Sequence, residues 1–92
     1  MDDILSRITD RLKEKYEHVF INERLFFKLN GLYFSPDKIS MFNVFVVEYA
    51  NNFNEAQNYM LEDGTQFPLE WGEDKIFNEM IKEIETEAKE SD

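Results

Sequence analysis

Three glutamates at four-residue spacing, Glu79, Glu83 and Glu87, form the pattern in this sequence that could carry chemistry. On a helix, side chains four positions apart lie on one face, so their carboxylates would form a row. Glu83 and Glu87 have no lysine three or four positions away, and like charges at that spacing cost roughly 0.2–0.5 kcal/mol. Such a row can imitate the phosphates of a nucleic acid or bind a basic protein surface. It is also typical of a solvated helix face.

Five acidic residues surround the turn that precedes this predicted helix: Glu70 and the four contact candidates Glu62, Asp63, Glu73 and Asp74. Carboxylates gathered at a turn could bind a hard cation. However, the register of an EF-hand loop would place Tyr59 and Leu61 at the first two ligand positions, and neither supplies a carboxylate. We therefore expect a structural turn, with no metal ion and no other cofactor. The acidic residues become candidates for contact with a partner.

Catalysis has little support in the sequence. Paired carboxylates can act as general acid and base, but this needs a pocket that separates their pKa values. The chain has no cysteine and a single histidine, His18. No phosphate-binding Gly-rich loop or nucleophile elbow is present. These absences predict a non-enzymatic protein.

The charge balance limits the kinds of partner. The 92 residues carry a net charge of −10, and residues 62–92 hold eleven acidic against three basic side chains. A surface of this sign disfavours direct binding to nucleic acid or to an anionic membrane. No apolar run approaches the roughly 20 residues of a membrane span, and the first eight residues lack the apolar core of a signal peptide. We expect a cytoplasmic protein.

Two amphipathic helices should frame a single domain over residues 1–92. The first, at about 3–17, has apolar residues on one face and Asp2 or Asp3 as its cap. The last, at about 73–89, has a core-facing stripe that runs from Ile76 to Ala88. These two helices are expected to cover a sheet.

Strand-like segments lie between the helices. Asn30 and Gly31 suit a tight hairpin turn between strands at about 24–29 and 32–34. A turn at 35–38 should lead to a central strand at about 40–50, because the run from Ile39 through Val47 is uncharged and rich in Val and Phe. A short strand at about 65–69 contains Pro68, which confines it to an edge. Residues 54–61 are compatible with either helix or strand.

This order predicts an α+β fold in which a small antiparallel sheet of three to four strands is packed against an N-terminal and a C-terminal amphipathic helix. In size, acidity and order of elements, the whole chain resembles small acidic inhibitors of phages and mobile elements, including some anti-CRISPR proteins and DNA mimics, and also toxin-immunity proteins. The resemblance implies that the acidic C-terminal third binds a basic protein surface. The alternative is a homodimer that associates through an apolar sheet face, because fourteen aromatic residues exceed what so small a core needs.

Overall fold

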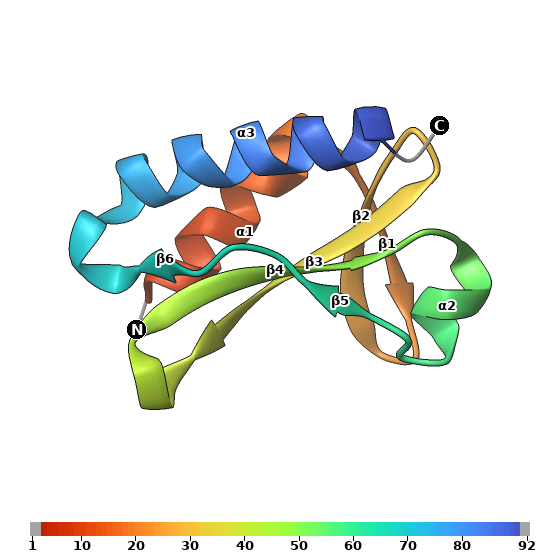
Figure 1. Ribbon diagram of the computed structural model, residues 1–92, viewed down its shortest axis with the longest axis horizontal. Helices are drawn as coiled ribbons and strands as arrows, with labels where there is room; N and C mark the ends of the chain where they lie inside the picture. Colours follow the sequence, from red (N-terminus) through yellow and green to blue (C-terminus); the bar gives the residue numbers. More distant parts are fainter. Residues whose placement is uncertain (1–2, 91–92) are drawn as a thin grey trace.

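The computed structural model describes residues 3–90, which form a helix, an antiparallel sheet and a second long helix (Figure 1). The predicted α+β class is confirmed, although the sheet has six strands rather than three or four. The elements are α1 (Ile4–Lys15), β1 (Glu17–Ile21), β2 (Arg24–Leu29), β3 (Leu32–Ile39), the 3-10 turn η1 (Ser40–Phe42), β4 (Val44–Ala50), α2 (Phe53–Gln57), β5 (Glu62–Asp63), β6 (Phe67–Pro68), the 3-10 turn η2 (Leu69–Trp71) and α3 (Glu73–Glu90).

Strands β1 to β4 form a meander in which each strand pairs antiparallel with the next. The predicted turn at Asn30 and Gly31 is confirmed, with φ values of 50° and 84°. A second turn of the same kind, at Asn22 and Glu23, has φ values of 52° and 68°. Two consecutive positive φ values are characteristic of a type I′ turn.

The predicted first helix, at 3–17, is too long, because α1 ends at Lys15 and Glu17 already pairs with Lys28. Tyr16 ends the helix in an extended conformation, although its ring continues the buried stripe of α1. Asp3 is the cap, and its carboxylate accepts a hydrogen bond from the Ser6 amide at 2.8 Å. Asp2 lies outside the described residues. The residues between the end of α1 and the turn at Asn22 and Glu23 form strand β1, which was not among the predicted strands.

The predicted turn at 35–38 is wrong, and the strand predicted at 40–50 is confirmed only over Val44–Ala50, because residues 40–42 form η1. Strand β3 continues through Pro36, which pairs with Val47 of β4. The pairing of β2 with β3 ends at Phe34, so beyond it β3 has a free side, where the missing N–H of a proline costs no ladder bond. The chain reverses instead at η1, which ends at Asn43 with φ 52°, directly before β4.

Both short strands after β4 pair back onto it: β5 next to Glu48 and Tyr49, and β6 next to Val44 and Phe45. Pro68 therefore lies in an edge strand, as predicted, whereas the acidic turn expected before α3 contains the short strand β5 at Glu62 and Asp63. The ambiguous segment 54–61 contains the short helix α2, because the Asn52 side chain accepts a hydrogen bond from the Glu55 amide and caps its first turn.

Helices α1 and α3 cover the same face of the sheet (Figure 1). The core between the two layers consists of Ile8, Leu12, Tyr16, Phe27, Leu32, Phe34, Phe45, Val47, Tyr49, Phe67, Ile76, Met80, Ile84 and Ala88. On the opposite face, α2 closes a smaller cluster of Ile21, Phe26, Ala50 and Ala56. Val44 and Val46 point to this second face and are buried nonetheless. Helix α3 therefore rests on the sheet with its outer side free.

Candidate binding site

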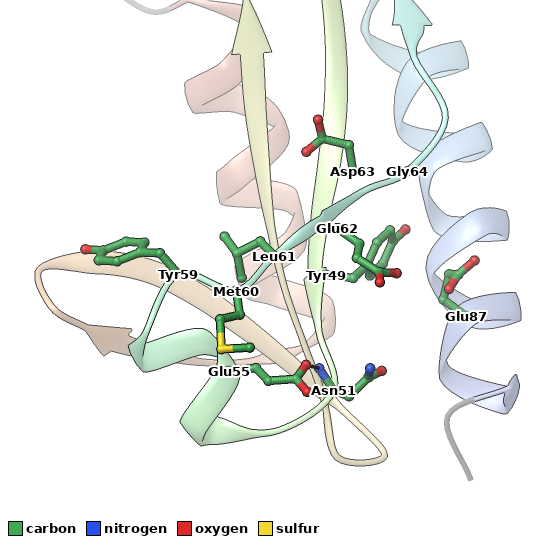
Figure 2. A pocket seen from close by; sticks show the side chains of 10 residues that line it. All are labelled: Tyr49, Asn51, Glu55, Tyr59, Met60, Leu61, Glu62, Asp63, Gly64 and Glu87. Atoms are coloured by element: carbon green, nitrogen blue, oxygen red, sulfur yellow. Dashed lines mark hydrogen bonds between the residues drawn. The ribbon is translucent and has the colours of Figure 1, made fainter.

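A cavity of about 480 Å³ lies where α2 and β5 meet the C-terminal half of α3. Figure 2 shows the side chains around it, which come from the end of β4, from α2 and the loop that follows, from β5 and from α3. They are Tyr49, Asn51, Glu55, Tyr59, Met60, Leu61, Glu62, Asp63, Gly64 and Glu87. The cavity is open to solvent, so it is suited to receive a group that projects from another molecule.

Four of the lining residues are acidic, and none of the described lining residues is basic. Glu62 reaches the cavity on the side of Glu87 because β5 passes beside α3, whereas Asp63, which also lines the cavity, directs its carboxylate to the other face of the strand (Figure 2). Burial raises the pKa of the Glu87 carboxyl, and the nearby carboxylates of Glu90, Glu83 and Glu62 raise it further. Since repulsion between carboxylates contributes to this shift, the potential around Glu87 is negative.

Glu83 supports the wall of the cavity through two hydrogen bonds. Its carboxylate accepts one from the Tyr49 hydroxyl at 2.6 Å and one from the Thr65 amide at 2.7 Å. Gly64 lies between these two donors, and a Cβ atom there would stand 2.4 Å from Glu83 Oε2. Glycine therefore allows β5 to approach α3 closely. Glu83 is part of the predicted acidic row, but its carboxylate is engaged within the chain.

The other predicted acidic residues lie elsewhere. Glu79 forms an ion pair with Lys82 at 2.9 Å. Glu73 accepts from Arg7 at 2.6 Å and from Arg11 at 3.0 Å, and Asp74 pairs with Arg11 at 2.9 Å. The Glu73 carboxyl has a lowered pKa, mainly through its hydrogen bond with Arg7.

Helix α3 thus separates the predicted residues into two groups. Glu73 and Glu87 are fourteen residues apart, which corresponds to about 21 Å along a helix. The group at the start of α3 is neutralised by α1. The group at its end, together with β5, forms the acidic wall of the cavity.

The apolar side of the cavity was not predicted from the sequence. Met60 is 60% exposed and Tyr59 is 55% exposed. Tyr59 adopts φ 57°, and its hydroxyl donates to the Asn22 carbonyl at 3.3 Å. A bulky residue in the left-handed region is strained, and such strain is concentrated at functional sites. The sequence feature that could have indicated this apolar side is the apolar triplet at 59–61, directly before two acidic residues.

The site offers hydrogen-bond acceptors and apolar contact. The Tyr49 hydroxyl has a strongly raised pKa, because it is buried and donates to the negatively charged Glu83. It therefore keeps its proton and acts as a donor. Within residues 3–90, no group of three or more His, Cys, Asp or Glu side chains is placed to hold a metal ion. In the same range, no helix is both long and apolar enough to cross a membrane.

No protein-family profile, curated protein or solved structure matches the chain. The function is therefore inferred from the site itself.

Proposed function

We propose that this chain is a small non-enzymatic protein-binding domain that presents the acidic side of its C-terminal third to a basic surface of a partner protein. The general resemblance in build to small acidic inhibitors supports a role in which binding blocks a nucleic-acid site or neutralises a toxin. A lysine or arginine side chain of the partner would enter the cavity between β5 and the end of α3.

The observation that carries this proposal is the pair of carboxylates at Glu62 and Glu87, which line a cavity without a basic side chain among its described residues. A cation placed there would relieve the repulsion that contributes to the raised pKa of Glu87. Complementary charges speed association and make it sensitive to salt. The adjacent Met60 and Tyr59 would contact the aliphatic part of the entering side chain.

The seven predicted contact residues are not equal in this arrangement. Glu62 and Glu87 form the acidic wall, so they are the primary contacts, and Asp63, whose carboxylate is on the other face of β5, is a secondary one. Glu79 is at the flank of the site, and Glu83 shapes the wall through Tyr49 and Thr65. Glu73 and Asp74 hold α1 against α3, so their replacement should affect stability before it affects binding.

The test is affinity capture from the native host at low and high salt, followed by titration of the captured partner. We expect the double variant Glu62→Lys and Glu87→Lys to weaken binding by roughly 100-fold or more, because truncating or reversing close charge pairs typically costs several kcal/mol. The matched control is Asp10→Lys with Glu14→Lys, two exposed residues of α1 that give the same change in net charge.

Equal affinities of the two double variants would show that only net charge matters and would reject the site. Binding that persists unchanged at high salt would reject the electrostatic mechanism. Circular dichroism of each variant confirms that the fold is intact before the affinities are compared.

A further inference from the structure

Strand β1 is the outer strand of the sheet at the end opposite β5 and β6, and within residues 3–90 it pairs with β2 alone. The type I′ turn makes Ile21 and Arg24 a hydrogen-bonded pair. In an antiparallel ladder such pairs alternate with non-hydrogen-bonded ones. Glu17, Val19 and Ile21 therefore direct their backbone groups to β2. The backbone groups of His18 and Phe20 point away from the sheet, and no other described segment hydrogen-bonds to them.

Apart from Glu17 at its start, which pairs with Lys28, this edge lacks the features that normally prevent edge-to-edge pairing. Strand β1 reads EHVFI, without proline, lysine or a bulge. Phe20 is 66% exposed although it occupies a regular strand. A five-residue edge of high β propensity with a solvent-exposed phenylalanine is a template for another strand.

We propose that β1 pairs antiparallel with β1 of a second copy of this chain, with the two-fold axis at Val19. In this register His18 lies opposite Phe20 of the second copy, and Phe20 lies opposite its His18. Both residues direct their N–H and C=O groups outward, so the two pairs are hydrogen-bonded and four backbone bonds form. Val19 then faces its own copy in a non-hydrogen-bonded pair.

The same register is complementary in side chains and charge. His18 and Phe20 project to one face, so each imidazole meets a phenyl ring across the interface. Glu17 lies opposite Ile21 of the second copy, so the two Glu17 side chains do not face each other. Within each chain, Glu17 forms an ion pair with Lys28 at 3.2 Å. Strand β1 of one copy is therefore complementary to β1 of a second copy in backbone, side chains and charge. The acidic end of α3 belongs to other elements, and its carboxylates do not enter the pairing.

A single cysteine at the two-fold axis gives a direct test, since the chain has no cysteine of its own. Non-hydrogen-bonded antiparallel pairs have Cα atoms about 4.5 Å apart, which lies within the range of about 4.4–6.8 Å that disulfides span. Under mild oxidation, Val19→Cys should form a covalent dimer. The control is Met41→Cys, whose side chain is 85% exposed at the turn between β3 and β4 and far more accessible than position 19.

We expect V19C to cross-link roughly 100-fold faster than M41C, which is the ratio of a millimolar effective concentration within a dimer to a concentration of about 10 µM in solution. Adding Phe20→Lys to V19C should reduce the rate to that of M41C, because it places a charge in the shared edge. The unmodified protein should sediment as a dimer, and the F20K protein as a monomer.

Equal cross-linking rates for V19C and M41C would overturn the proposal, as would a strictly monomeric unmodified protein at high micromolar concentration. Capture of a foreign strand by a protein that is monomeric alone would also overturn it. Circular dichroism of F20K separates a loss of pairing from a loss of fold. None of these measurements depends on the acidic cavity, so the dimer and the proposed function can fail separately.

Discussion

Replacing Gly64 by alanine tests the close approach of β5 to α3, which sets the shape of the acidic cavity. The added Cβ would stand 2.4 Å from Glu83 Oε2 and 2.9 Å from both Glu83 Cδ and a ring carbon of Tyr49. All three distances are shorter than van der Waals contact. The strand must shift, or the Glu83 side chain must move away from its two donors.

Either response has an approximate cost. Overpacking of a well-packed site costs about 1–3 kcal/mol. Moving Glu83 would break two hydrogen bonds to a carboxylate, each worth about 1.5 kcal/mol at the lower end of the range for charged groups. We therefore expect Gly64→Ala to lower the free energy of unfolding by about 2–3 kcal/mol. For a chain of this size, that corresponds to a decrease in Tm of roughly 8–24 °C.

The assay is urea and thermal unfolding followed by circular dichroism, with two comparisons. Gly31→Ala meets nothing within 4 Å but has φ 84°, so it should cost about 1 kcal/mol through backbone conformation alone. In a Glu83→Ala background, two of the three short contacts of Gly64→Ala are gone, so its cost should fall by about half or more. A steric role for Gly64 is refuted if G64A costs no more than G31A, or if the cost of G64A is the same with and without Glu83.

Three further changes test other contacts. Glu87→Gln should stabilise the protein at pH 7 by roughly 0.3–0.5 kcal/mol, the cost of neighbouring like charges. Because the folded state raises the pKa of Glu87, its ionisation costs stability at neutral pH. The gain in stability should vanish as the pH falls below the ordinary pKa of glutamate. Thermal unfolding at pH 7 and pH 3 measures this, and a gain that persists at pH 3 would contradict the expectation. Tyr49→Phe removes the donor to Glu83 and should cost about 1–2 kcal/mol in urea unfolding, whereas an unchanged midpoint would show that the bond contributes nothing. Arg11→Lys removes the guanidinium whose Nη1 pairs with both Glu73 and Asp74 and whose Cζ lies 4.0 Å from the centroid of the Phe77 ring. The variant should be less stable at low salt, with a smaller deficit at high salt, and a deficit independent of salt would assign the role of Arg11 to the ring alone.

Much of the fold is predictable from local pattern. The stripe from Ile76 to Ala88 defines α3, and the Asn30 and Gly31 turn defines one hairpin, because each depends on residues close in the chain. The turn at Asn22 and Glu23 was missed, since a glutamate with φ 68° is not a residue that favours this conformation. Because this turn was not predicted, β1 was not predicted either, and the first helix was predicted to end two residues too late.

The central run from Ile39 through Val47 shows a different limit. Its uncharged, β-rich composition indicates burial but cannot locate a reversal that contains neither glycine nor proline. The turn at η1 is completed by Asn43 in the left-handed region, one of the few residue types that tolerates it. Composition therefore predicted that this segment belongs in the sheet, but not that the chain reverses within it.

The site was predicted in part, for a similar reason. Helical spacing places Glu83 and Glu87 on one face, but spacing cannot show that Glu83 is engaged by Tyr49, 34 residues away. Likewise, Glu73 meets Arg7 across 66 residues. Such pairings depend on how α1, β4 and α3 pack together. Only the tertiary structure separates acidic residues that pair within the fold from those that line the cavity.

The position of α3 also bears on the order of folding. Strands β1 to β4 contact their neighbours in sequence, so the meander can form with little loop-closure entropy. The helix that completes the core must then return across the sheet to meet α1. Until it does, Phe27, Phe34 and Phe45, which are fully buried in the folded chain, have only part of their cover. A nascent chain that lacks α3 would therefore expose an aromatic surface at its most aggregation-prone stage, and rapid docking of this acidic helix would protect the protein while it folds.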